Sequence, residues 1–365
     1  WVPGCNNCRA AGPSRRLRFT QANQKEENAM SCKTIVSLLM AGFFLCAASA
    51  PAAPHTTLTI AMGDPESSEM GVVGNAFKKY VEDKTNGAIQ VVCIYGGSPG
   101  DDEGERFRKV QKGTLDMALG GIANIVPLEK KLGLLTLPYL FANLNEVVAG
   151  TNGAPAELLN KYATEAGFRI LTWTYTGFRF ISNDKHPITK LSDMKGLKFR
   201  VPQSAVMIAT YKAFGAIPSL IPWSMTFNAL QSGDVDGQCY GYIGFRAMKF
   251  NEANQRYLTE VHYTYHLQPL VISERVFEKL TPEVRQILID AGKYAQEKVL
   301  KYQIEQADAA KKYLIDNGLQ VSQLEDEDVW KKAAMEKVWP EMADFVGGKE
   351  TINAYLKACG KPLWK

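Results

Sequence analysis

The pattern that most constrains this fold is an early alternation of expected strands and helices. Residues 57–63 (TLTIAMG) alternate apolar and polar side chains and end in glycine, which predicts a strand and a turn. A helix with an apolar face over residues 70–81 follows and closes at Gly87. Residues 88–97 predict a second strand, and residues 103–121 predict a helix and a third strand. This alternation indicates an α/β fold with a parallel, doubly wound sheet.

The rest of the chain continues the alternation. We expect a helix over residues 156–166, a long apolar strand pair over residues 168–183 and another strand over residues 194–202. Helix, strand and helix are then expected within residues 206–238. Thr281-Pro282-Glu283 gives a favourable N-cap to a helical tract that ends at Asn317. Two α/β lobes joined by strands that cross more than once fit this order.

Charge and composition exclude several classes of protein. The chain has 365 residues, 46% hydrophobic and 22% charged, which is ordinary for a globular protein and enough for two domains. The net charge of +4 comes from the N-terminal region, because removing its six basic and two acidic residues leaves 36 of each sign. The body of the chain is therefore neutral, which argues against a nucleic-acid partner.

The N-terminal region indicates export to the periplasm. From Met30 one lysine precedes an uncharged apolar run over residues 35–48, which is too short for a membrane span and typical of a secretory signal. We expect a signal peptide over residues 30–53, with cleavage between Ala50 and Ala53, and residues 1–29 are interpreted as upstream sequence from an early start. Three cysteines remain after cleavage, Cys93, Cys239 and Cys359, and one disulfide is open to them.

No motif for a cofactor, a metal or catalysis stands out. The phosphate loop and the dinucleotide-binding glycine turn are both absent from the sequence. Ser98 lies in a GxSxG match, but Pro99 follows it and has no N–H for an oxyanion hole. His262 and His266 have the spacing of a zinc pair, yet their segment alternates like a strand, which favours packing or surface roles. We therefore expect no cofactor, no metal and no enzymatic activity.

Arginines and aromatic residues gather where expected strands and helices end. The planar guanidinium matches a carboxylate in two parallel hydrogen bonds, and an aromatic ring can cover the apolar part of a small ligand. The alternative is that the arginines pair with Asp184 or Asp193 and that the rings belong to the core. The residues in question are Arg179, Arg200, Trp223 and Tyr240.

Six segments, in this order and spacing, resemble the DctP-like solute-binding proteins of TRAP (tripartite ATP-independent periplasmic) transporters. They span residues 82–292 and read EDKTNGAIQV, KVQKGTLDMAL, LTLPYLF, DMKGLKFRVPQS, PWSMTFNALQSGDVDGQ and LTPEVRQILIDAG.

The resemblance implies a two-lobed periplasmic binding protein-like fold with hinge-connected α/β domains and a central ligand cleft. We assign residues 54–176 and 265–304 to lobe I, and residues 177–264 and 305–365 to lobe II. The family implies capture of a small organic anion in the cleft and its delivery to a permease with a large and a small membrane subunit. A monomer is expected.

On the same resemblance, Arg200 matches the arginine that pairs with the ligand's carboxylate. Arg179 matches a second cleft arginine, and Trp223 lies where a large aromatic residue packs on the ligand. Gln203 is a further ligand-binding candidate beside Arg200. Tyr240 stands where many members have an asparagine, which favours a less hydroxylated or aromatic acid.

Three acids are the expected contacts from the other lobe: Asp64, Glu69 and Glu105. Acids that face the ligand would favour a ligand with hydroxyl or amine donors. This expectation differs from the one drawn from Tyr240, which favours a less hydroxylated or aromatic acid. Two other readings stay open, a secreted enzyme on the same two-lobed scaffold and a sensor that reports ligand occupancy to a membrane kinase.

Overall fold

A computed structural model describes residues 56–97 and 102–365, which belong to one compact unit that begins at residue 53. The predicted upstream segment, the signal peptide and its cleavage site lie outside the described residues. Within those residues no helix is both long and apolar enough to cross a membrane.

The first sheet has five strands in the order β2-β1-β3-β10-β4. The three early strands are parallel, as predicted, but β10 runs antiparallel to both β3 and β4, so the sheet is mixed. The expectation of a purely parallel sheet is wrong because β4 and β10 form a long antiparallel pair. The strands are β1 (Thr56–Met62), β2 (Ile89–Ile94), β3 (Met117–Leu119), β4 (Phe168–Phe178) and β10 (Tyr265–Ser273).

The second sheet has six strands in the order β11-β9-β5-β8-β6-β7. Here β6 is parallel to β7 and β8, whereas β5 is antiparallel to β8 and β9. The strands are β5 (Phe180–Asn183), β6 (Lys198–Val201), β7 (Ile217–Leu220), β8 (Gly237–Tyr240), β9 (Tyr257–Glu260) and β11 (Gln320–Gln323).

Two chain segments cross between the sheets side by side. One passes from β4 to β5 through Arg179, and the other returns from β9 to β10 through residues 261–264. The backbone N–H of Arg179 donates to the carbonyl of Thr264 at 2.9 Å, so the two crossings are hydrogen-bonded to each other. Each sheet has buried apolar residues of its own, as a two-lobed α/β fold requires.

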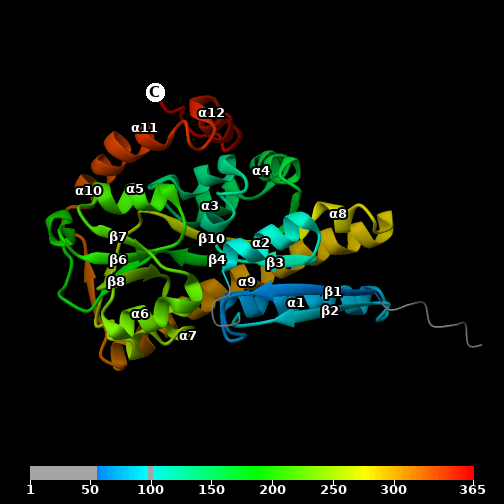
Figure 1. Ribbon diagram of the computed structural model, residues 1–365, viewed down its shortest axis with the longest axis horizontal. Coiled ribbons are helices and arrows are strands. Elements are labelled where there is room, and N and C mark those ends of the chain that lie inside the picture. Colours follow the sequence, from blue (N-terminus) through cyan, green and yellow to red (C-terminus); the bar gives the residue numbers. More distant parts are fainter. Residues whose placement is uncertain (1–55, 98–101) are drawn as a thin grey trace, which may run out of the picture. The chain divides into compact units, whose positions relative to one another are not determined.

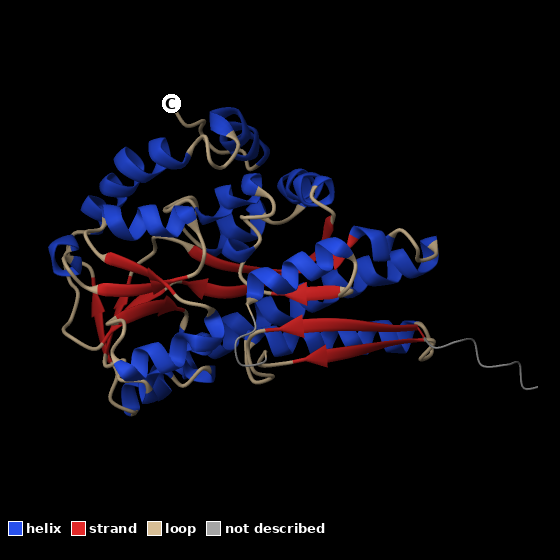
Figure 2. Ribbon diagram, in the orientation of Figure 1, coloured by secondary structure: helices blue, strands red, loops and turns tan. Residues whose placement is uncertain are grey.

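Helices cover the strands on both sides (Figure 2). Those of the first half are α1 (Glu69–Lys84), α2 (Glu103–Lys112), α3 (Leu144–Gly150), α4 (Gly153–Glu165), α5 (Ala205–Ala213) and α6 (Thr226–Ser232). Those of the second half are α7 (Tyr242–Ala247), α8 (Glu274–Phe277), α9 (Pro282–Asp316), α10 (Glu327–Ala333), α11 (Trp339–Met342) and α12 (Gly348–Ala358). Shorter helical turns are η1 (Ile122–Asn124), η2 (Lys130–Thr136), η3 (Leu191–Met194), η4 (Trp223–Met225), η5 (Phe250–Glu252) and the π-helical η6 (Ala334–Val338).

The long helix α9 begins and ends as the sequence predicts. The Thr281 side chain accepts a hydrogen bond from the N–H of Val284, Pro282 occupies the first turn, and Asn317 is the C-cap. The helix packs against α1 and β4 beside the first sheet and against α7 beside the second (Figure 1). Since α9 contacts elements of both sheets, it forms a third connection between them.

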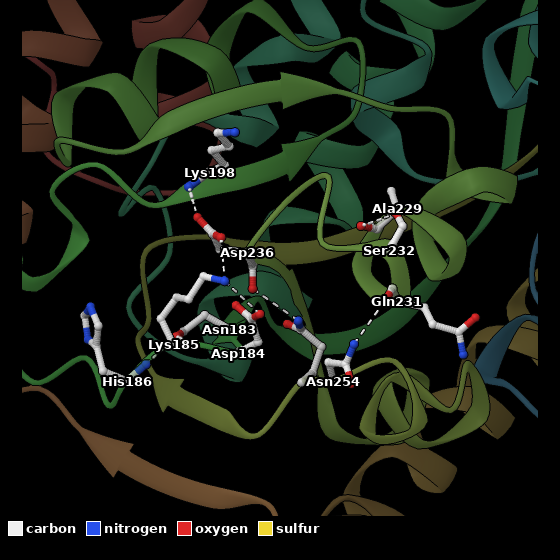
Figure 3. A network of polar contacts seen from close by, with 11 residues as sticks. Asn183, Asp184, Lys185, His186, Lys198, Ala229, Gln231, Ser232, Asp236 and Asn254 are labelled. Carbon is white, nitrogen blue, oxygen red and sulfur yellow. Dashed lines mark hydrogen bonds and ion pairs between the residues drawn. The ribbon is translucent and has the colours of Figure 1, made fainter.

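The GDVDGQ run, residues 233–238, holds together the strand starts at one end of the second sheet (Figure 3). The Asp236 carboxylate accepts from the N–H of Lys198 at 2.7 Å and pairs with Lys185 at 3.2 Å. The Asp236 N–H in turn donates to the carbonyl of Lys198. These contacts hold the first residues of β6 and β8 together, so the last residues of both strands emerge side by side at the other end.

Candidate functional site

The site lies where both sheets change the direction of their winding. In the first sheet β1 stands between β2 and β3, and in the second sheet β6 stands between β7 and β8. Successive connections therefore leave these central strands toward opposite sides, which opens a crevice at the carboxyl ends of the strands. Asp64 follows β1 and Asn124 follows β3, while Arg200 and Tyr240 end β6 and β8. These side chains line one small cavity.

Arg200 is buried without an acidic partner. Its Nε donates to the carbonyl of Ile221 at 2.9 Å, and its guanidinium lies over the Trp223 ring. It is 4% exposed, and among the residues that the structure describes no carboxylate lies within 4 Å of it. Burial and the nearby Arg179 lower the pKa of Arg200 to about 10, so it keeps its charge at neutral pH. Its two amino groups form no hydrogen bond with another described residue.

Arg179 is oriented by a neighbour from each sheet, one on β8 and one on β10. One amino group donates to the carbonyl of Cys239 at 3.0 Å, and the other lies 2.8 Å from Nε2 of His266. Burial and the adjacent arginines hold the pKa of His266 well below its usual range, so the ring is neutral. Its Nε2 therefore accepts from Arg179, and the Nδ1–H is left without a partner in the described part of the chain.

Asp64 faces the arginines from the first sheet and binds two aromatic residues of the second. Oδ1 accepts from Nε1 of Trp223 at 2.8 Å, and Oδ2 accepts from the hydroxyl of Tyr240 at 2.6 Å. The two rings stack with centroids 5.2 Å apart. Burial raises the pKa of Asp64, although both hydrogen bonds and two arginines oppose the shift.

Glu103 provides a second buried acid at the start of α2. Its carboxylate accepts from the side-chain amide of Asn124 and, at 3.4 Å, from the N–H of Gly121. Burial raises the pKa of Glu103, opposed by Arg106 and Arg200. An arginine of one sheet and an acid of the other thus face the same cavity.

The cavity is almost closed in this structure. It measures about 10 Å³, which is room for about one water molecule. An organic acid can enter only if the residues of the two sheets move apart, and the hydrogen bonds from Trp223 and Tyr240 to Asp64 then have to break.

The structure brings five of the predicted residues together: Arg179, Arg200, Trp223, Tyr240 and Asp64. Glu69 is buried nearby but does not line the cavity, whereas Gln203 is exposed and Glu105 pairs with Arg108 on the surface of α2.

The alternative partners of the arginines are engaged elsewhere. Asp184 pairs with Lys185, and Asp193 accepts from the N–H groups of Thr189 and Lys190. The three cysteines Cys93, Cys239 and Cys359 are free thiols.

Sequence reasoning missed four polar side chains of the cavity: Glu103, Asn124, His266 and Gln268. Asn124 follows the third expected strand, and this place after a strand end is a signal that could have found it. His266 was considered only as half of a zinc pair, but His262 instead pairs with Glu327 on the surface. Gln268 gives no signal, because only the antiparallel crossing of β10 places it beside Tyr240, to which it donates at 3.1 Å.

Comparison with known proteins identifies the family of this chain. The family model of bacterial extracellular solute-binding proteins, family 7 (DctP), matches residues 60–345. A solute-binding protein of Verminephrobacter eiseniae is 34% identical over 250 residues, 67% of this chain and 72% of that protein.

Two solved TRAP periplasmic solute-binding proteins have the same fold, each with a TM-score of 0.77. The protein from Ralstonia eutropha, with bound (S)-2-acetolactate, is 28% identical and covers 84% of this chain and 99% of its own. The protein from Polaromonas, bound to D-erythronate, is 29% identical and covers 82% and 98%. The chain therefore belongs to the DctP family of bacterial extracellular solute-binding proteins, and it is a periplasmic receptor of the TRAP type and not an enzyme.

Proposed function

We propose that this receptor binds a small organic acid whose carboxylate lies on Arg200, with Arg179 as a second donor. The observation that carries the proposal is the guanidinium of Arg200, which is buried near the end of β6 and is paired with no acidic side chain of residues 56–97 and 102–365. A buried cation without a counter-ion is costly, and a ligand carboxylate removes that cost through charge-assisted hydrogen bonds. The ligands of the two similar structures, acetolactate and D-erythronate, are both carboxylates, which supports the proposal.

The expected contacts are sufficient for useful affinity. Micromolar binding needs about 8 kcal/mol. A hydrogen bond to a charged group contributes about 1.5 to 3 kcal/mol, so two bonds from Arg200 and one from Arg179 supply half or more of it. Trp223 and Tyr240 add apolar contact with the ligand's carbon atoms.

Binding is proposed to couple to closure of two lobes. We assign residues 54–176 and 265–304 to lobe I, and residues 177–264 and 305–365 to lobe II. A ligand that touches Arg200 on one side and Asp64 on the other favours the closed state, since it contacts both lobes only there. The closed, loaded monomer is proposed to dock on the large and small membrane subunits of a TRAP permease.

The test combines ligand identification with one substitution. Native mass spectrometry of the freshly purified protein should reveal a bound acid, and a thermal-shift screen of carboxylates should find the compounds that stabilise it. Arg200→Ala should abolish the shift given by the best compound. Unchanged stabilisation of Arg200→Ala would rule out the proposed role of this arginine.

A further inference from the structure

The wall of the cavity opposite Arg200 is made of two buried carboxylates. Asp64 is 1% exposed and follows β1, and Glu103 is 8% exposed and begins α2. Among the described residues neither forms an ion pair within 4 Å, although the buried Arg106 lies within electrostatic reach of both, as do Arg179 of Asp64 and Arg200 of Glu103. The cavity is therefore cationic on one side and acidic on the other.

The hydrogen bonds define Asp64 as an acceptor on both oxygens. The indole Nε1 of Trp223 can only donate, so Oδ1 must accept from it. The Tyr240 hydroxyl receives a hydrogen bond from Nε2 of Gln268, so its own proton goes to Oδ2 of Asp64. When the lobes separate, both donors leave and the two oxygens need new donors.

The carboxylate of Glu103 likewise accepts hydrogen bonds on both of its oxygens. Both hydrogen bonds to its carboxylate come from N–H donors, the amide of Asn124 and the backbone of Gly121. Neither donor comes from the second sheet, so closure leaves Glu103 in place at the cavity wall. A ligand that reaches this wall meets oxygen acceptors on two residues.

We propose that this acceptor wall limits the receptor to monocarboxylic acids with hydroxyl groups along the chain, and that Asp64 is the residue that excludes dicarboxylates. The inference rests on the proposed function, because it takes the ligand's first carboxylate to lie on Arg200. A hydroxyl group donates to Asp64 or Glu103 and satisfies a buried acceptor. A second carboxylate has no proton to donate and meets only hydrogen-bond acceptors on these two residues in a site with little water, which is strongly unfavourable.

Tyr240 is consistent with this ligand class. Its ring removes the amide that many family members have at this position, but its hydroxyl is committed to Asp64. Tyr240 therefore positions the acceptor that reads the ligand's hydroxyl group, and the preference for a less hydroxylated acid does not follow from its presence.

The experiment uses acids matched in length. Affinities are measured by calorimetry for three sets: glycerate, malonate and propanoate; erythronate, succinate and butyrate; gluconate, adipate and hexanoate. In the set that fits the cavity best, the hydroxylated monocarboxylate should bind at least 100-fold more tightly than the dicarboxylate and at least 10-fold more tightly than the unsubstituted acid. Asp64→Asn should reduce the ratio of the affinity for the hydroxylated monocarboxylate to that for the dicarboxylate at least 10-fold. Asp83→Asn, the same change at an exposed site on α1, should leave it unchanged.

The outcomes separate this inference from the proposed function. A dicarboxylate that binds within threefold of its hydroxylated partner, or an unchanged ratio in a folded Asp64→Asn variant, overturns the inference and leaves carboxylate capture intact. Binding of only the unsubstituted acids would likewise overturn the inference and leave carboxylate capture intact. Failure of all nine compounds to bind at millimolar concentration counts against both proposals.

Discussion

The guanidinium carbon of Arg200 lies 5.2 Å from the centroid of the Trp223 ring, and the edge of the same ring donates to Asp64. Trp223 therefore connects the buried arginine of one sheet with the acid of the other. Its face stabilises a buried cation, and its Nε1–H satisfies a buried anion. Substitutions at Trp223 can separate these two contributions.

Trp223→Phe keeps an aromatic face over Arg200 but removes the donor to Asp64. Because Oδ1 of Asp64 then has no partner in the closed state, we expect a cost of about 1 to 3 kcal/mol in closure and a 5- to 100-fold loss of ligand affinity. Trp223→Leu also removes the ring and should cost a further 0.5 to 2 kcal/mol, roughly. Calorimetry on both variants measures the contribution of the Nε1–H donor and the contribution of the ring face to ligand affinity. Equal affinities for the two variants would show that the ring face contributes nothing.

Gly244 allows the Tyr240 ring to lie directly on α7. A Cβ at this position would be 1.5 Å from Cε1 of Tyr240, which no small adjustment relieves. Replacing glycine with alanine within a helix normally stabilises it by about 0.5 to 1 kcal/mol. Here we expect the opposite, a loss of about 1 to 3 kcal/mol in the free energy of unfolding, because the added methyl group overlaps the Tyr240 ring. We expect Gly244→Ala to displace Tyr240, weaken its bond to Asp64 and lower ligand affinity along with the unfolding midpoint. An unchanged midpoint and affinity would contradict this packing.

Glu69 makes the stability of the protein depend on pH. It is fully buried at the start of α1, neither carboxyl oxygen has a hydrogen-bond partner on another described residue, and burial raises its pKa to about 8. The folded state therefore binds one more proton than the unfolded state between the ordinary pKa near 4.5 and about 8. The free energy of unfolding should fall as the pH rises through this window, by on the order of 4 kcal/mol from this group.

Urea unfolding at pH 5, 7 and 9 tests this dependence. Glu69→Gln removes the titrating group without removing a hydrogen bond, so its stability should vary much less over the same range. Glu105→Gln changes an exposed acid of α2 and should retain the wild-type dependence. A Glu69→Gln variant with the full wild-type slope would show that another group causes it.

Local sequence patterns were enough for many of the elements over residues 57–238, for the long helix α9 and for part of the site. The alternation of strands and helices placed Arg200, Trp223 and Tyr240 at element ends, where an open α/β sheet binds ligands. The caps of α9 were readable because Thr281, Pro282 and Asn317 act through their nearest neighbours. Such signals depend on residues a few positions apart, which a sequence displays directly.

The remainder depends on contacts between distant segments. The antiparallel run of β10 against β3 and β4 made the first sheet mixed and brought His266 and Gln268 to the cavity. Trp223 was expected to cover a ligand with its ring, but its Nε1–H also reaches Asp64, 159 positions away. No periodicity encodes such a contact, because it arises only when both sheets and their connections have formed.

The most direct test of the account pairs a change in the protein with a change in the ligand. The best-binding acid and its carboxamide are each titrated by calorimetry into the wild type, Arg200→Lys and Arg200→Ala. If Arg200 binds the carboxylate, Arg200→Ala should lose at least 100-fold in affinity for the acid but little for the amide, and Arg200→Lys should recover only part of the loss. If Arg200→Ala binds the acid within threefold of wild type, or loses acid and amide equally, Arg200 is not the carboxylate's partner.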